Sequence, residues 1–323
     1  MHMRKIIGFL SGALALATLA GAGPAVSGTT LSAANCFPKG TYFARPFEAL
    51  IADINEQSKG DLTLNYRGGA PAIGSPFTLV QKASKGVFDS VSCTGSYYQN
   101  VLPEVDAFKM LERGLEEVRA NGAVAYMNRL HEAKGLHYIG RIMSYTPFHL
   151  YLNKPIDKPD LKGLHLRVAP IYTAFFQALG ATTQRSNIAQ VYTYMENGTV
   201  HGYGWPITGI LPDWHKVTKY RVDPGFYNAD LEILVNLKKW QALGRSQQEL
   251  MTRIVIEHEK AATRFATDVE KAVVVQAKNG IETIEFTGAD RTAWLAAARE
   301  AGWANIIKRS PEHGPKLRAL FAK

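Results

Sequence analysis

The chain has 323 residues, of which 46% are hydrophobic and 20% are charged, and this composition excludes a disordered or fibrous protein. Its length accommodates two lobes that each bury a core of their own. The formal net charge is +9, but the Lys and Arg residues are scattered, and no continuous basic track of the kind that binds nucleic acid is present.

The N-terminus has the pattern of a secretory signal peptide. Arg4 and Lys5 precede an apolar run, Ile6 to Ala20, and small residues follow it as far as Ala25-Val26-Ser27. The apolar run is shorter than the roughly 20 residues that a membrane span needs. We therefore expect residues 1–27 to be removed and the mature chain to be soluble and exported.

Strand and helix periods alternate along the first part of the mature chain, which is the pattern of an α/β protein. Strands are predicted at 29–34, 62–66 and 88–93, and helices at 42–59 and 77–84. From Gly135 onward the pattern changes, because three successive segments have strand character with only short turns between them. These strands are predicted at 136–142, 148–153 and 164–168, so a second sheet is expected to start here.

A charged residue interrupts the last of these apolar strands, in the segment GLHLRVAP from Gly163 to Pro170. Strand alternation places Leu164, Leu166 and Val168 on one face, and Arg167 lies on the other. A guanidinium group matches a carboxylate with two parallel hydrogen bonds, so Arg167 is a candidate anchor for an acid. The alternatives are an arginine on the solvent face of an edge strand or in an ion pair between lobes.

The clearest helix signal predicts one long element over 246–279. Ser246 and Glu249 have the spacing of a capping box, in which the two residues satisfy each other's free backbone donors. Gly280 supplies a stop signal at the other end. A helix of about thirty residues is roughly 45 Å long, which exceeds what one lobe needs. We expect a strut that the two lobes share.

The motifs of common enzyme and metal sites are missing. The sequence contains no Gly-x-Ser-x-Gly turn for a nucleophile and no His-Glu-x-x-His zinc motif. Gly202-Tyr203-Gly204 resembles the start of a dinucleotide loop, but the third glycine is absent. The histidines and the two cysteines lack metal-ligand spacing. We interpret the chain as a binding protein without a catalytic residue, a cofactor or a metal ion, and a secreted enzyme remains the alternative.

Aromatic residues recur at the ends of predicted strands. In open α/β sheets the loops beyond the strand ends form the ligand crevice, so aromatic side chains there suit an enclosed apolar site. For each single residue, packing in a core is the alternative. The residues are Phe37, Tyr42, Tyr97, Tyr98, Tyr145, Phe148, Tyr203, Trp205, Phe226 and Tyr227.

The order and spacing of five segments resemble the periplasmic substrate-binding proteins of TRAP transporters, the DctP-like family. The resemblance covers nearly all of the mature chain, and its most specific element is the Leu-Lys-Gly-Leu-x-Leu-Arg-Val segment. The five segments are 68–74, 85–89, 161–168, 179–182 and 191–206.

This resemblance implies an α/β fold of the two-lobed periplasmic binding protein type, with a ligand cleft between the lobes and a long helix shared by both. It implies a periplasmic, monomeric protein that captures an organic carboxylate and delivers it to the permease subunits of a TRAP transporter, and not an enzyme. We expect residues 28–145 and 234–273 in lobe I, and 146–233 and 274–323 in lobe II.

In this family the arginine matching Arg167 pairs with the substrate carboxylate. Two departures from the family pattern bear on the ligand. Trp205 stands where many members have an Asn, and a second arginine common in the family has no counterpart near His149, which is the candidate replacement. One fixed cation beside aromatic rings suits a monocarboxylate with a flat or apolar body. A C4-dicarboxylate or sugar acid is the alternative ligand.

The resemblance also implies that residues on the lobe opposite Arg167 contact the ligand. Thr94 and Tyr97 follow the strand that faces the ligand in this family. We include Cys93, Ile188, Tyr42 and Tyr227 among the candidate ligand-binding residues. A disulfide between Cys36 and Cys93 is possible, because the strands that carry them are neighbours in this fold and an exported chain meets an oxidising compartment. Two free buried thiols are the alternative.

The family resemblance leaves two further roles open for an exported two-lobed protein. A binding protein of an ATP-driven importer would have similar lobes, but it should lack the combined spacing of the Leu-Arg-Val and Gly-Ala-Thr segments. A solute sensor would bind the same ligand and pass it to a receptor. The sequence does not distinguish transport from sensing.

Overall fold

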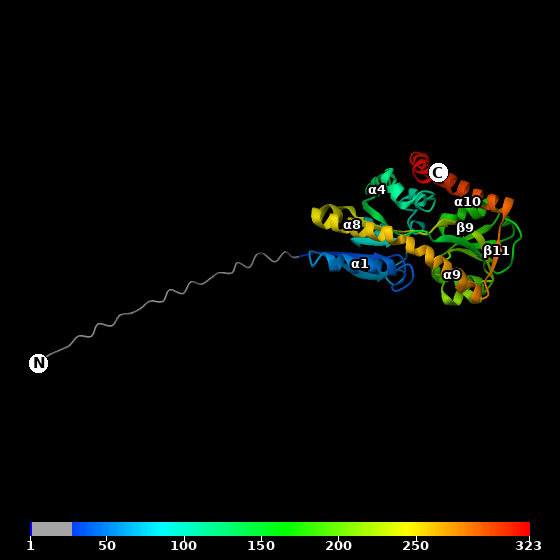
Figure 1. Ribbon diagram of the computed structural model, residues 1–323, viewed down its shortest axis with the longest axis horizontal. Helices are drawn as coiled ribbons and strands as arrows, with labels where there is room; N and C mark the ends of the chain where they lie inside the picture. Colours follow the sequence, from blue (N-terminus) through cyan, green and yellow to red (C-terminus); the bar gives the residue numbers. More distant parts are fainter. Residues whose placement is uncertain (2–27) are drawn as a thin grey trace.

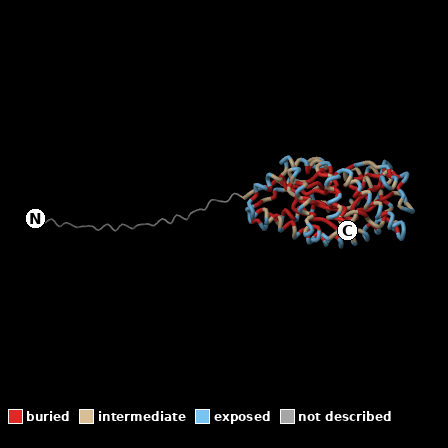
Figure 2. Tube along the Cα trace, turned by 90° about the horizontal axis from the view of Figure 1, so that it is seen from above, coloured by how far each residue is buried: buried red, intermediate tan, exposed pale blue. Residues whose placement is uncertain are grey.

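The computed structural model describes Met1 and residues 28–323, so the expected signal peptide falls outside the described residues apart from Met1. The described chain forms two lobes, each built on its own mixed β-sheet with helices on its faces (Figure 1). Buried residues run through the interior of both lobes, and exposed residues cover the outside (Figure 2). Among the described residues, no helix is both long and apolar enough to cross a membrane.

The sheet of the first lobe has the strand order β2-β1-β3-β10-β4. Strand β1 pairs in parallel with β2 and β3, and β10 pairs antiparallel with β3 and β4. The strands predicted at 29–34, 62–66, 88–93 and 136–142 are present, although β2 is three residues longer and β3 two residues shorter than expected. The expectation that a second sheet starts with the strand at 136–142 is wrong, because β4 pairs with β10 and forms an edge of the first sheet. The strands are β1 Thr29–Asn35, β2 Leu62–Gly69, β3 Ser90–Cys93, β4 Leu136–Met143 and β10 Leu231–Asn236.

The sheet of the second lobe has the order β11-β9-β5-β8-β6-β7. Strand β5 lies antiparallel to β8 and β9, and β6 pairs in parallel with β7 and β8. The strands predicted at 148–153 and 164–168 are confirmed as β5 and β6 within one residue at each end. The strands are β5 Pro147–Leu152, β6 His165–Val168, β7 Thr182–Arg185, β8 Gly202–Pro206, β9 Tyr220–Asn228 and β11 Glu282–Glu285.

Short helices cover both sheets. In α1, Phe47, Leu50, Ile51 and Ile54 are buried at helical spacing, which explains why this segment packs as an amphipathic helix. Pro46 lies in its first turn, where a missing N–H leaves no backbone acceptor unsatisfied. The α-helices are α1 Arg45–Gln57, α2 Leu79–Ser84, α3 Leu115–Ala120, α4 Ala123–Glu132, α5 Thr173–Ala178, α6 Val191–Glu196 and α7 Leu237–Ala242. Short 3₁₀ helices are η1 Gly95–Tyr97, η2 Pro103–Phe108, η3 Pro170–Tyr172, η4 Ile188–Gln190 and η5 Pro212–Lys216.

The shared strut is present, but it is two helices and not one. Helix α8 (Arg245–Lys260) packs on α1 and β4 of the first lobe, and α9 (Phe265–Lys278) packs on β11 of the second (Figure 1). The 3₁₀ segment η6 (Ala261–Arg264) joins them where the chain leaves the first sheet. The single continuous helix predicted over 246–279 is therefore wrong, because the two lobes hold the two halves in different directions.

The capping box predicted at Ser246 and Glu249 does not form. The helix begins two residues earlier, with Gly244 as its N-cap, and the Gln247 side chain accepts a hydrogen bond from the Gly244 N–H at 3.1 Å. Glu249 instead pairs with Arg245 at 2.8 Å on the helix surface. Only one of the two hydrogen bonds of a capping box is made, because Gly244 has no side chain to accept one in return.

The C-terminal helices α10 (Gly288–Arg309) and α11 (Gly314–Phe321) connect the lobes a further time. Helix α10 contacts α5 and β9 of the second lobe and η2 of the first, whereas α11 packs on η2 and α4. The Phe321 ring lies 5.7 Å from that of Phe108 in the first lobe. The expected assignment of all of 274–323 to the second lobe therefore does not hold for α11, whose apolar face is buried against the first.

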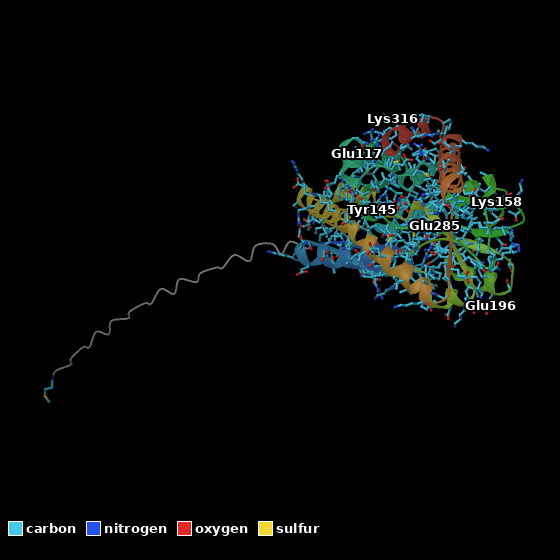
Figure 3. All side chains as sticks on the ribbon, turned by 45° about the vertical axis from the view of Figure 1, so that its right-hand side comes forward. Glu117, Tyr145, Lys158, Glu196, Glu285 and Lys316 are labelled. Atoms are coloured by element: carbon cyan, nitrogen blue, oxygen red, sulfur yellow. A yellow bond between two sulfur atoms is a disulfide. The ribbon has the colours of Figure 1, made fainter. Side chains whose placement is uncertain are left out.

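Three connections between lobes lie close to the sheets. The first links β4 to β5, the second links β9 to β10, and the third is η6. The first two are side by side, because the Ala229 N–H donates to the Thr146 carbonyl at 2.8 Å. Tyr145, labelled in Figure 3, belongs to the first connection; it has φ of 59° and is 37% exposed. Tyr145 does not line the cavity between the lobes, contrary to the expectation for aromatic residues at strand ends.

Candidate functional site

A cavity of about 30 Å³ lies between the lobes. The carboxyl ends of β1, β3, β6 and β8 converge on it, which is where open α/β sheets bind ligands. Its wall combines aromatic rings with a few polar groups from both lobes. The lining residues are Phe37, Phe43, Thr94, Ser96, Tyr97, Ala229 and Asp230 from the first lobe and its connection, and Phe148, Ala169, Tyr172, Trp205 and Pro206 from the second.

Arg167 lies in β6 directly behind the second-lobe wall of this cavity, with 0% of its surface exposed. Its Nε donates to the Ser186 hydroxyl at 3.2 Å, Nη2 donates to the Ser186 carbonyl, and Nη1 donates to the Tyr172 hydroxyl at 3.2 Å. A longer contact of 3.5 Å joins Nη1 to the Gly204 carbonyl. Every one of these partners is neutral.

The charge of Arg167 is therefore not balanced by a carboxylate within the described part of the chain. Four hydrogen bonds also leave at least one of the five guanidinium N–H groups without an acceptor. A buried cation with only neutral partners is unfavourable unless a counter-ion arrives. The arrangement can stabilise an anion that enters the cavity beside Tyr172.

Trp205 forms the aromatic part of the same wall at the end of β8. The Arg167 guanidinium carbon lies 5.8 Å from the Trp205 ring centre. The indole packs edge-on against Phe43 of the first lobe at 5.8 Å and against Trp214 at 5.1 Å. Its Nε1 donates to the Gly209 carbonyl at 3.3 Å, which fixes the ring orientation. Trp205 thus lies between the Arg167 guanidinium group and Phe43 of the opposite lobe.

Tyr97 faces this wall from η1 of the first lobe. Its ring lies 5.5 Å from Phe37 and 4.9 Å from Phe77. Burial raises the pKa of the Tyr97 hydroxyl to about 12, and the Arg167 charge opposes that shift. The hydroxyl is therefore neutral at physiological pH and available as a hydrogen-bonding group near the cation.

A disulfide joins Cys36 and Cys93, which are 57 residues apart in the sequence. It links the residue after β1 to the last residue of β3, and both sulfur atoms are buried. Phe37 and Thr94, the next residues along each chain segment, line the cavity. Cys93 itself lies outside the cavity wall, and its disulfide holds together the two segments that carry Phe37 and Thr94.

Thr94 is held by a buried ion pair. Its hydroxyl donates to Asp230 Oδ1 at 2.7 Å, and the same oxygen forms an ion pair with Lys109 Nζ at 2.5 Å. Burial raises the pKa of the Asp230 carboxyl, but the Lys109 charge, a hydrogen bond with Glu232 and the Arg141 charge together outweigh burial and leave the pKa below its ordinary value. Asp230 is therefore ionised, and Thr94 is locked as a donor to it.

Two of the predicted site residues lie away from the cavity. His149 Nδ1 contacts Asp223 Oδ1 at 2.8 Å and the Val222 carbonyl at 3.0 Å, so its charge partner is already within the protein. The Tyr227 hydroxyl donates to the Ala298 carbonyl of α10 at 2.7 Å, beside a separate cavity of about 320 Å³. The structure brings neither side chain to Arg167.

Ile188 and Tyr42 lie at a neighbouring hollow of about 230 Å³, which shares Phe37 and Phe43 with the central cavity. Tyr42 belongs to the first lobe, and its hydroxyl donates to Asp268 Oδ2 of α9 at 2.9 Å. Burial raises the pKa of this hydroxyl above its ordinary range, so it keeps its proton. The bond spans the two lobes next to the site.

We expect Tyr42→Phe to weaken ligand affinity about fivefold, mainly through faster dissociation, because one hydrogen bond to a carboxylate is lost from the closed arrangement. Stopped-flow tryptophan fluorescence measures both rates. Tyr192→Phe is the matched control, since Tyr192 donates to Glu196 at 2.8 Å within a single helix of the second lobe. Equal effects of the two substitutions would exclude a role for the bond between lobes.

Sequence reasoning missed several residues of the site. Tyr172 and Ser186 hold the guanidinium of Arg167, Ser96 and Asp230 line the cavity, and the Arg185 guanidinium lies 4.3 Å from the Phe77 ring across the lobes. Ser96 adjoins Tyr97 in a segment already singled out for facing the ligand, so its position was a usable signal. Ser186 and Asp230 had none, because their partners are distant in the sequence.

Comparisons with known proteins agree with this architecture. Residues 34–309 match the family described as bacterial extracellular solute-binding protein, family 7, DctP. A protein of Sinorhizobium fredii is 25% identical over 93% of this chain, and the chain spans 58% of that protein's length. A solute-binding protein of Roseobacter denitrificans is 24% identical over 78% of both chains.

Solved structures share the fold at low identity. The Roseobacter denitrificans protein with bound L-galactonate superposes with a TM-score of 0.76 and 18% identity, over 91% of this chain and 98% of that one. A TRAP periplasmic solute-binding protein of Desulfovibrio salexigens with bound orotic acid gives 0.80 and 18%, over 90% and 97%. The two-lobed arrangement with a cleft between the lobes is therefore that of the TRAP binding proteins.

Proposed function

Because this chain belongs to family 7 of the bacterial extracellular solute-binding proteins, we propose that it captures a small organic carboxylate in the periplasm and delivers it to the membrane permease of a TRAP transporter. The observation that supports an acidic ligand is Arg167, which is fully buried behind the cavity wall with neutral partners alone. A carboxylate supplies the missing counter-charge and accepts two charge-assisted hydrogen bonds.

We further propose that the ligand is a monocarboxylate with a planar or largely apolar body. The second cation considered from the sequence, His149, is engaged by Asp223 and lies outside the cavity wall. Phe37, Phe43 and Trp205 offer ring faces and edges instead of further charges. The bound molecules of the two solved relatives, orotic acid and L-galactonate, are both acids, and the aromatic wall favours the planar kind.

The proposed mechanism is closure of the lobes around the ligand. The cavity of about 30 Å³ is far smaller than the roughly 150 Å³ that holds a benzene ring, so the lobes must separate before a ring can enter. The carboxylate then binds Arg167 on the second lobe, and aromatic side chains of both lobes cover the rest. A ligand that contacts both lobes favours the closed form over the open one, and the monomer in that form is what the permease receives.

The test is a thermal-shift screen of the purified chain with four acids: benzoate, orotate, L-galactonate and succinate. At about 100 times its dissociation constant, a true ligand raises the unfolding midpoint by about 5 °C. We expect benzoate or orotate to produce such a shift. A shift with succinate or L-galactonate alone would contradict the planar monocarboxylate and favour the alternative ligand class. Recovery of a chemically altered acid after incubation would favour an enzyme.

A further inference from the structure

The first-lobe wall of the cavity contains a polar side chain without a partner. Ser96 lines the cavity, is 3% exposed, and its Oγ makes no hydrogen bond within the described part of the chain. A buried hydroxyl left in this state destabilises the protein, because no hydrogen bond compensates for its removal from water. Such a group at a binding cleft points to a hydrogen bond that is completed by a ligand.

Thr94, on the same wall, has only one hydrogen-bonding role left. Its single hydroxyl hydrogen is committed to Asp230, which is ionised and also receives the Lys109 ammonium. The Gly95 N–H is directed to the same carboxylate at 3.4 Å. Because the hydroxyl hydrogen is taken, the free lone pairs of Thr94 Oγ1 can accept a hydrogen bond but cannot complement a second acceptor.

We propose that Ser96 and Thr94 form a second polar subsite that recognises a neutral O–H or N–H group of the ligand, at the end away from its carboxylate. This inference rests on the proposed function and narrows its substrate class to hydroxy or ring-NH monocarboxylates. A second carboxylate does not fit there, because it has no proton for Thr94 and lies near the negative Asp230. A plain hydrocarbon ring leaves Ser96 unpaired.

The two subsites lie on opposite lobes, so a ligand that fills both affects the balance between the open and closed forms. Arg167 belongs to β6 of the second lobe, whereas Ser96 lies in η1 of the first, which contacts η3 of the second in this structure. A ligand whose carboxylate is its only polar group makes hydrogen bonds with one lobe, and its contacts with the other lobe are apolar. A donor at its far end adds a hydrogen bond to the first lobe, so the donor further stabilises the closed form.

The test compares benzoate with 3- and 4-hydroxybenzoate by isothermal titration calorimetry. We expect the better hydroxybenzoate to bind the unaltered protein about tenfold more tightly than benzoate, and terephthalate to bind more weakly than either. Ser96→Ala should remove the hydroxybenzoate advantage and change benzoate affinity by less than about twofold. The unfolding midpoint of the ligand-free variant should be unchanged or raised, because an unpaired polar atom is removed.

Ser92→Ala is the matched control. The Ser92 Oγ is also buried without a partner, it lies in β3 of the same lobe, and it is outside the cavity wall. The control should keep the full hydroxybenzoate advantage. If Ser92→Ala and Ser96→Ala reduce it equally, the loss is a general effect of the lobe and the subsite is wrong.

The outcomes separate this inference from the function on which it rests. If benzoate and both hydroxybenzoates bind equally well, the second subsite is wrong and the capture of monocarboxylates stands. If hydroxybenzoates are preferred but Ser96→Ala leaves the preference intact, the assignment to Ser96 is wrong. If no acid of the set binds while succinate does, the proposed ligand class fails, and the subsite fails with it.

Discussion

Replacing Arg167 with methionine should reduce carboxylate affinity at least about a hundredfold, because two charge-assisted hydrogen bonds are lost from a desolvated site. The same substitution should leave the free energy of unfolding of the ligand-free protein unchanged or increased. The reason is that Arg167 has no carboxylate partner within the described part of the chain, so a buried and uncompensated charge is exchanged for an apolar side chain of similar length. We therefore expect Arg167→Met to lower the affinity for carboxylates without lowering the stability of the ligand-free protein.

The binding side of this prediction is measured by calorimetry, and the stability side by unfolding in urea. Arg167→Lys should recover only part of the affinity, because the ammonium group lacks the planar fork. Arg221→Met is the matched control: Arg221 is also buried, but it bonds to Asp223 at 2.9 Å and to Gln276 at 3.0 Å. This control should lower the unfolding free energy by about 3 kcal/mol.

Two results would contradict the role assigned to Arg167. Unchanged affinity of Arg167→Met for every acid that binds the unaltered protein would exclude it as the anchor. A loss of stability as large as that of Arg221→Met would mean that its hydrogen bonds to Ser186 and Tyr172 have a structural purpose instead.

The second large effect is expected from the disulfide. Replacing both Cys36 and Cys93 with alanine should lower the unfolding free energy by about 4 kcal/mol, because the bond closes a loop with a sequence separation of 57 and restricts the unfolded chain. Urea unfolding with and without a reductant measures this. The reductant should destabilise the unaltered protein by a similar amount and leave the double variant unaffected. A double variant as stable as the oxidised protein would contradict the prediction.

Loss of the disulfide should also affect ligand capture. The cysteines immediately precede Phe37 and Thr94, which line the cavity from two different strands. Without the covalent link, the ends of β1 and β3 are joined by hydrogen bonds alone: the strand pairing at Ala33, Ala34 and Asn35, and the bond from the N–H of residue 36 to the Ser92 carbonyl. We expect the affinity of the double variant to fall together with its stability, whereas Arg167→Met lowers affinity alone.

Much of the fold could be predicted because its signals are local. Alternating and helical periods identify strands and helices from neighbouring residues, and they located β1, β2, β4, β5 and β6 within a few residues. The same alternation placed Arg167 on the opposite face from Leu164 and Leu166. The break at η6 could not be predicted, since nothing in Ala261–Arg264 disfavours an α-helix; the directions of the two lobes impose it.

The site was harder to predict because side-chain partners come from distant segments. His149 was a reasonable second cation by position, but Asp223, 74 residues later in the chain, engages it. Tyr227 lies near the end of β9, yet its hydroxyl donates to the Ala298 carbonyl of α10. In both cases the competing partner belongs to an element whose packing direction the sequence does not specify.

The position of β10 in the first sheet determines when during synthesis that sheet can fold. In the first sheet β10 lies between β3 and β4, although the chain makes β5 to β9 of the other lobe before it. The N-terminal lobe therefore cannot close its sheet until residue 236 has left the ribosome, and its folding depends on contacts far apart in sequence, which form slowly. A nascent chain with this topology keeps its first sheet incomplete while β5 to β9 of the second lobe are synthesised.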